Sequence, residues 1–326
     1  MSMSRRKFVS GLPAFATLGP WVQARAEDRY PSRPVRFVVP FAPGGPADAI
    51  SRLVTSRLQE QLGQPVVIEN IPGTGGGLGV ARLARMPADG YSIGFAHTAT
   101  FGIGPHLFKN VAYNAEKDFT PIARMCEYIN VLVVRADSPF QSLNDLLAAA
   151  QARPGTVNYG SAGNGSSNHL SGELLAMQSK TSLIHVPYRG SALALNDVLA
   201  GNLQFMFDAP NIALPHLRSG KLRALAVTGR TRHRLLPEVP AVNETLPGYE
   251  VIGWMGVVGP AGLPAAVQRR LAAEIEKTLA APDTADRIAA LGLDVSYGGP
   301  QELGQAIRRD LALWGPVIKA SGLRLD

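Results

Sequence analysis

The sequence predicts an α/β protein built of two lobes. Over most of the chain, short β-branched runs alternate with segments in which apolar residues recur at helical spacing, a pattern typical of sheets with helices on both faces. From about residue 264 the pattern changes to amphipathic helices without strong strands between them. We therefore expect two lobes with mostly parallel sheets, the first lobe being completed by the C-terminal helices.

The β-branched runs and the segments with helical spacing predict the elements of the first lobe. A strand is expected at 35–39 (VRFVV), and apolar residues at helical spacing predict a helix over 46–63. Strands at 65–70 and 91–96 and a short helix at 77–86 continue the alternation.

The second lobe is expected to begin with the apolar run VLVV (131–134). The segments that follow it alternate between helix and strand: NDLLAAAQA, VNYGS, LSGELLAMQ, LIHVPY, SALALNDVLAG, LQFMFD, a short helix ending at Leu217 or Arg218, and LRALAVTG. The chain is expected to cross between the lobes near 125–130 and 248–256. The predicted bounds are 27–127 and 250–326 for the first lobe and 128–249 for the second.

Residues 1–26 resemble an export signal of the twin-arginine type. Arg5 and Arg6 precede a modest apolar run, and Ala24-Arg25-Ala26 offers small residues for cleavage. The apolar run is too short and too often broken by Gly and Pro to span a bilayer. A soluble mature protein outside the cytoplasm, starting at about Glu27, is therefore expected.

Charge and cysteine content narrow the class of protein. The formal net charge is +7, but residues 1–26 hold four basic residues and no acid, so 28 basic against 25 acidic residues remain, a net charge of +3. This small excess suits an anionic small molecule and argues against nucleic acid as a partner. Cys126 is the single cysteine; no internal disulfide is possible, and an apolar neighbourhood favours a core position.

Four turns rich in glycine or serine follow predicted strands, where α/β proteins bind ligands. They are APGGPAD (42–48), NIPGTGGGLG (70–79), GSAGNGSSNHL (160–170) and YRGSA (188–192). Glycine lets backbone N–H groups approach a ligand, and a helix N-terminus adds unpaired donors. The turn at 70–79 has a competing interpretation as a tight turn for close packing.

The sequence lacks the common nucleotide-binding and catalytic motifs. The Walker pattern is missing, and the dinucleotide pattern would need glycine at Leu78 or Val80. The hydrolase elbow, zinc motifs and paired carboxylates are missing as well. Ser166 or Ser167 with His169 could form a nucleophile–base pair, but helix capping explains these hydroxyls better. A binding protein without cofactor or metal, and not an enzyme, is the expectation; an exported Ser/His hydrolase is the alternative.

The mature chain resembles the Bug or TctC-like extracytoplasmic receptors of tripartite tricarboxylate transporters. The resemblance rests on segments from YPSRPVRFVVPFAPGGPAD through QPVVIENIPGTGGGLG, VNYGSAGNGSSNHLSGELL, HVPYRGSA and FMFDAP to LPHLRSGKLRALAVTGRTRHRLLPEVPAV. It implies a type II periplasmic-binding-protein fold and a periplasmic location. It also implies a small carboxylate bound between the lobes and a membrane permease as partner. A monomer is expected, and a sensor that docks on a membrane signalling protein is an alternative.

Site residues are carried over from the same resemblance. In the first lobe they are Phe41, Ala42, Pro43, Gly44, Gly45, Asp48 and Thr98. In the second lobe they are Ser161, Gly163, Asn164, Gly165, Ser166, His169, Tyr188, Arg189, Gly190 and Asp208. Arg189 either clamps a distal carboxylate or projects to solvent, and Tyr188 is either wall or core. Pro46 departs from the Gly, Ser or Thr of relatives and removes one amide donor.

Overall fold

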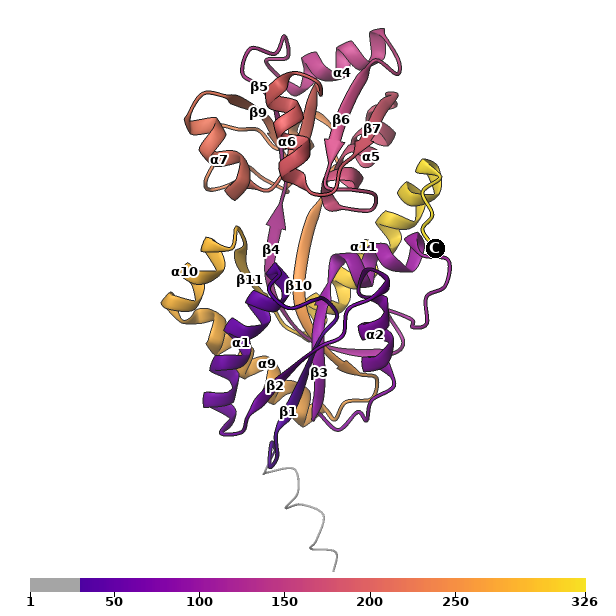
Figure 1. Ribbon diagram of the computed structural model, residues 1–326. Helices are drawn as coiled ribbons and strands as arrows, with labels where there is room; N and C mark the ends of the chain where they lie inside the picture. The colour runs from indigo at the N-terminus through magenta and orange to yellow at the C-terminus, as the bar shows by residue number, and fades with distance from the viewer. Residues whose placement is uncertain (1–29) are drawn as a thin grey trace, which may run out of the picture. The chain divides into compact units, whose positions relative to one another are not determined.

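A computed structural model describes residues 30–326, of which 31–326 form one compact unit. The predicted export signal therefore lies outside the described residues. Two β-sheets, each with its own helices, make up this unit (Figure 1).

The first sheet has six strands in the order β11-β4-β10-β3-β1-β2. Its strands are β1 (Val35–Val39), β2 (Val66–Asn70), β3 (Ser92–His97), β4 (Phe119–Ile129), β10 (Ile252–Pro260) and β11 (Asp294–Gly298). The helices of this lobe are α1 (Pro46–Leu62), η2 (Thr74–Gly76), α2 (Gly77–Ala84), η3 (Ala99–Ile103), α3 (Gly104–Leu107), α9 (Ala265–Ala280), α10 (Pro282–Ala290) and α11 (Pro300–Ser321). The tail thus contains a strand, β11, which the sequence pattern did not indicate because this edge strand is only partly buried.

The second sheet has five strands in the order β7-β6-β8-β5-β9. Its strands are β5 (Val131–Arg135), β6 (Val157–Ser161), β7 (Leu183–Pro187), β8 (Phe205–Asp208) and β9 (Leu222–Val227). Its helices are α4 (Leu143–Ala152), α5 (Ser167–Ser179), α6 (Ser191–Ala200), α7 (Pro210–Arg218) and α8 (Val242–Thr245).

Strand direction differs from the expectation of mostly parallel sheets. The strand pairs β1–β2, β1–β3, β6–β7 and β6–β8 are parallel. The pairs of β10 with β3 and β4, of β11 with β4, and of β5 with β8 and β9 are antiparallel. The prediction was wrong because three strands run against the direction of the βα units: β5 and β10, which enter a sheet from the other lobe, and the edge strand β11.

The crossing between the lobes is held by one buried hydroxyl. Asn130 alone separates β4 from β5, and its N–H donates to Thr228 Oγ1 at 2.8 Å. The same hydroxyl donates to the carbonyl of Val251, just before β10, at 2.7 Å. Backbone bonds from Thr228 to Asn130 and from Val251 to Thr228, both 2.9 Å, complete the junction. Thr228, fully buried, therefore ties both crossing segments together.

The cores are apolar and follow the sheets. One cluster packs Val38, Phe101, Phe119 and Trp254 inside the first lobe. Another combines lobe 2 residues with Trp314 and other residues of α11. Cys126 is buried as expected, and burial raises the pKa of its thiol to about 12.

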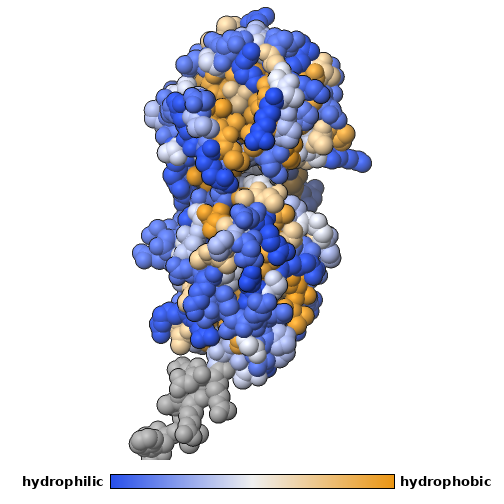
Figure 2. Space-filling view, turned by 90° about the vertical axis from the view of Figure 1, so that its left-hand side faces the viewer, coloured by the Kyte–Doolittle hydropathy of each residue, from blue (hydrophilic) through white to orange (hydrophobic). Residues whose placement is uncertain are grey.

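On the face shown in Figure 2, hydrophilic residues cover most of the surface and hydrophobic ones gather in separate patches. Within residues 30–326, every helix is too short or too polar to cross a membrane.

Candidate ligand-binding site

Strand topology brings the predicted loops of the first lobe to the crossing. The last residue of β3, His97, pairs with Met255 near the start of β10, and β10 begins with Ile252 opposite Ile129. Because β1 runs parallel to β3, the turns after both strands lie at this edge of the sheet.

Strand topology also brings the predicted loops of the second lobe to the crossing. Asp208, the last residue of β8, pairs with Val131, the first residue of β5. Strands β6 and β7 run parallel to β8, so their turns share that edge. Since Asn130 joins the two edges, the predicted loops of both lobes face the junction between them.

Asp48 organises the first turn. Its Oδ2 accepts the N–H of Gly44 at 3.0 Å and the guanidinium of Arg52 at 2.8 Å. Its Oδ1 accepts the amide of Asn70 at 3.0 Å, and that amide also donates to the carbonyl of Phe41 at 3.0 Å. The hydrogen bond and charge of Arg52, with the Gly44 and Asn70 bonds, lower the pKa of Asp48 to about 2 against the effect of burial. Asp48 thus holds the turn from inside, with both carboxylate oxygens already occupied.

The N-terminus of α1 is open. Gly45 is the N-cap in extended conformation, Pro46 is the first helical residue, and no side chain caps the helix. Proline has no N–H, so Ala47 and Asp48 supply the first amides without an intrahelical partner. Ala42, Pro43 and Gly44 beside them are exposed. These amides and the helix dipole suit an anion.

An aromatic row adjoins this turn. Phe41 meets Phe95 and His97 edge-on, and the His97 ring stacks on Phe95 and on Tyr128. His97 Nδ1 accepts the N–H of Ala99 at 3.0 Å, so the ring proton lies on Nε2, 3.2 Å from the Tyr128 hydroxyl. Burial lowers the pKa of His97 to about 4, which keeps the ring uncharged at neutral pH.

Thr98 is a buried residue directly after β3. Its hydroxyl accepts the N–H of Trp254 at 2.8 Å, and its side chain is buried. It therefore joins the end of β3 to β10.

The turn after β6 is held by its own side chains. The buried Ser161 Oγ accepts the N–H of Gly163 at 3.0 Å and lies 2.7 Å from His185 Nε2. Gly165 donates its N–H to His169 Nδ1 at 3.1 Å. Ser166 is the N-cap of α5 and accepts the N–H of His169 at 3.3 Å. Asn164, at the tip of the turn, is exposed.

The turn after β7 leads to a second open helix end. Gly190, with φ of +122°, is the N-cap of α6, which no side chain caps. The half-buried Tyr188 donates its hydroxyl to Asp197 and packs against a core cluster of the second lobe. Arg189 is exposed and forms no ion pair with any residue of the described chain.

Asp208 lies beneath the surface of the same edge. It is 1% exposed; Oδ1 accepts the N–H of Ala209 at 2.8 Å, and Oδ2 has no hydrogen-bond partner within the described residues. Burial raises the pKa of this carboxyl to about 6, with the Ala209 bond acting in the opposite direction.

Two positioning residues were missed at the sequence level. Asn70 ends β2, and its polar side chain at a strand end was a usable signal. His185 lies inside the apolar run LIHVPY, and nothing in that run separates it from a core histidine.

The geometry disfavours a hydrolase built on Ser166 and His169. Ser166 Oγ accepts from the backbone of His169, and the ring of His169 is engaged by Gly165. Ser161 does approach His185 at 2.7 Å, but its side chain is fully buried, where a substrate carbonyl would not reach it. Residues 30–326 also hold no group of three or more potential metal ligands.

Close packing explains the glycine-rich turn at 70–79. A Cβ on Gly79 would lie 2.6 Å from the carbonyl of Ile71 and 2.8 Å from Cα of Pro40. A Cβ on Gly76 would lie 2.7 Å from the side chain of Thr100. The competing interpretation of this turn therefore accounts for Gly76 and Gly79.

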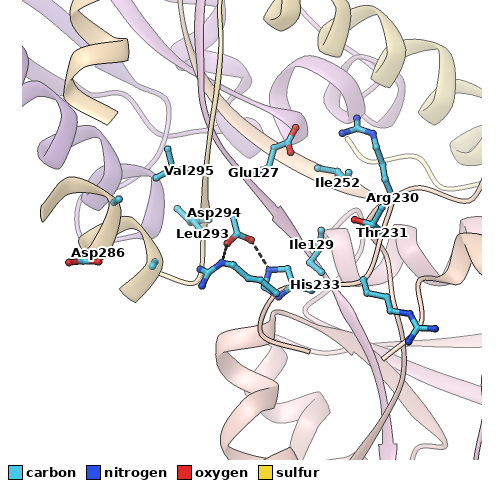
Figure 3. Close-up of a pocket in the computed structure, with 15 residues that line it drawn as sticks. Glu127, Ile129, Arg230, Thr231, His233, Ile252, Asp286, Leu293, Asp294 and Val295 are labelled. Carbon is cyan, nitrogen blue, oxygen red and sulfur yellow. Dashed lines mark hydrogen bonds and ion pairs between the residues drawn. The ribbon is translucent and has the colours of Figure 1, made fainter. Parts of the chain in front are cut away.

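A cavity of about 720 Å³ lies elsewhere at the crossing (Figure 3). It shares no lining residue with the predicted site. Asp294 of β11 accepts His233 Nε2 at 2.7 Å and Arg234 Nε at 2.9 Å across it. Of its other cationic side chains, Arg230 pairs with Glu250 and Arg232 with Glu244. Since each arginine already has a carboxylate, the predicted loops remain the better anion site.

The fold and the paired loops define a two-lobed protein of the periplasmic-binding type. A family model described as the tripartite tricarboxylate transporter family receptor matches residues 50–323. The chain is also 39% identical over 319 residues to a UPF0065 protein of Pseudomonas sp. strain P51, covering 97% of this chain and 94% of the relative. The chain belongs to the tripartite tricarboxylate transporter receptor family, as its sequence motifs indicated.

Two solved structures of similar proteins contain a bound carboxylate. Rpa4515 of R. palustris, with adipate, is 32% identical with a TM-score of 0.72, covering 90% of this chain and 99% of that one. MatC (Rpa3494) of Rhodopseudomonas palustris, with malate, is 33% identical with a TM-score of 0.69, covering 89% and 100%.

Proposed function

We propose that this protein is a periplasmic receptor that captures a small carboxylate between its lobes and delivers it to a membrane permease. One observation carries the proposal: the turn at 41–48 is braced from within by Asp48 and leaves the amides at the start of α1 open. The open N-terminus of α6 in the other lobe offers a second anion-binding end. Adipate and malate in the related structures support a dicarboxylate.

Export and partner follow from the same proposal. Residues 1–26 carry the twin-arginine pattern, and cleavage near Ala26 would release the chain into the periplasm. The permease is inferred from the family's role in tripartite transporters. The protein acts as a monomer that binds and releases its solute without chemical change.

A carboxylate panel tests the function. We expect purified protein, unfolded and refolded to remove captured solute, to gain stability from at least one mono-, di- or tricarboxylate. Because a ligand that binds only the folded state stabilises it by mass action, 100 times its dissociation constant should add about 2.7 kcal/mol. Thermal unfolding monitors the gain, and matched neutral amides serve as controls. No stabilisation by any member of the panel would contradict the proposal.

Gly45→Val tests the first turn. The backbone at Gly45 is extended, and an added Cβ would have only the carbonyl of Ala42 near it, at 4.0 Å. We expect an unchanged melting temperature but binding weakened by at least about tenfold, or 1.4 kcal/mol, because the side chain covers the open amides.

Gly299→Val is the matched control for this change. Gly299 is also an extended N-cap followed by proline, at the start of α11. Calorimetric titration with the best carboxylate of the panel should leave Gly299→Val unaffected. Equal affinity of Gly45→Val and wild type would remove this turn from the site.

A further inference from the structure

Two stacked histidines lie under the turn 162–165 of the second lobe. The rings of His169, on α5, and His185, on β7, stack with centroids 3.7 Å apart. We propose that this pair positions the turn for binding, His169 through Gly165 and His185 through Ser161, and that neither ring contacts the solute. The inference rests on the proposed function, because it assigns roles within the same site.

His169 holds one end of the turn. Its Nδ1 accepts the N–H of Gly165 at 3.1 Å, so this nitrogen carries no proton and the ring proton is on Nε2. Nε2 lies 3.4 Å from Glu173 Oε1. The hydroxyl of Tyr159 donates to the same oxygen at 2.7 Å and lies 3.2 Å from the carbonyl of His169. Glu173 and Tyr159 thus fix the tautomer and the orientation of the ring.

His185 holds the other end through Ser161. Its Nε2 lies 2.7 Å from Ser161 Oγ, which in turn accepts the N–H of Gly163 at 3.0 Å. Gly163 has φ of +125°, a conformation that few residues other than glycine adopt. The link from His185 to Ser161 therefore stabilises the part of the turn that has a positive φ.

The surroundings keep His185 uncharged. The titratable groups that face the two rings are Glu173 on α5 and Tyr159 on β6, besides the rings themselves. Burial first, and then the neighbouring His169, lower the pKa of His185 to about 4. At neutral pH, His185 therefore acts as a hydrogen-bonding group rather than as a cation that attracts a carboxylate.

Several predicted donors are occupied by these bonds. The N–H groups of Gly163 and Gly165 are donated within the turn, and Ser166 caps α5. Asn164, exposed at the tip, and the first amides of α5 remain to meet a solute. Gly163, Gly165, Ser161 and His169 thus shape the turn, and Asn164 is the contact residue.

The test compares His185→Ala with His185→Gln. Malate and adipate serve as probes in calorimetric titration, and hydrogen exchange of segment 160–167 is followed in the solute-free protein. We expect His185→Ala to weaken binding at least about tenfold and to speed exchange of the segment. Glutamine can reach Ser161 with a polar atom, so His185→Gln should recover most of both. His216→Gln, in the same lobe on α7, is the matched control and should behave as wild type.

Two further measurements keep the test decisive. If His185→Ala does not fold, Ser161→Ala should show the same faster exchange, because it removes the bond to Gly163. Imidazole ¹⁵N spectra of wild type at pH 7 should show His169 unprotonated at Nδ1 and protonated at Nε2. Wild-type exchange in both alanine variants, or a proton on His169 Nδ1, would overturn the inference. If no carboxylate binds wild type, the proposed function fails, while the exchange and ¹⁵N measurements still decide the positioning role.

Discussion

Asp48→Asn should weaken carboxylate binding at least about tenfold and lower the free energy of unfolding by about 2 kcal/mol. Asparagine keeps the shape of the side chain but loses the negative charge that Gly44, Asn70 and Arg52 share. The turn that presents the open amides of α1 would then lose its brace, because hydrogen bonds to a charged acceptor are the stronger ones. Titration with a panel carboxylate and urea unfolding measure the two effects.

The contribution of Asp48 to the free energy of unfolding should fall as the pH is lowered. Its pKa is about 2 in the folded protein against 3.8 ordinarily, so its carboxylate stabilises the fold fully above pH 3.8. That contribution is lost as the pH falls from 3.8 towards 2. The difference in stability between wild type and Asp48→Asn should shrink over this window. Asp286→Asn, at an exposed site on α10, is the control; a constant difference down to pH 2 would contradict the assignment.

Thr228→Val is expected to lower the free energy of unfolding by about 3 kcal/mol. The substitution conserves shape but removes the hydroxyl that accepts from Asn130 and donates to Val251. Two buried backbone groups then lose their partners, and each unsatisfied group costs about 1–3 kcal/mol. Because both groups belong to the crossing segments, hydrogen exchange should rise first at 128–131 and 250–253.

Thr231→Val is the control for Thr228→Val. Thr231 is exposed three residues farther along the same connection, so the stability of this variant should stay close to that of wild type. Equal stability of Thr228→Val and Thr231→Val in urea would show that the hydroxyl does not hold the junction.

The βα units could be predicted from the sequence because each depends on local signals. The strand at 35–39 and the helix beginning at Pro46 agree with β1 and α1, and the turn between them contains the expected glycines. Strand β11 escaped prediction because its half-exposed residues show no strong apolar run. Strand direction also escaped it, since pairing of β10 with β3 joins residues more than 150 positions apart.

The candidate site also has features that the sequence predicted and features that it did not. Glycine-rich turns marked where a solute could bind, because backbone access and helix ends depend on local sequence. The partners of their side chains did not follow, because Asn70 reaches Asp48 and His185 reaches Ser161 from neighbouring strands. Residues carried over as contacts, such as Ser161 and Gly165, therefore stay predictions whose structural bonds favour a supporting role.

By itself, the sequence determined the family, the alternation of strands and helices, and the glycine-rich turns that follow the strands. Those features depend on periodicity, turn residues and motifs that lie within a few tens of residues. Only the tertiary structure decided that Thr228 joins the two crossing segments and that Asp48 holds the turn at 41–48. It also decided that His169 and His185 stack beneath the turn at 162–165. Such pairings depend on which strands become neighbours in a sheet, and contacts between distant segments, rather than local propensity, decide that order.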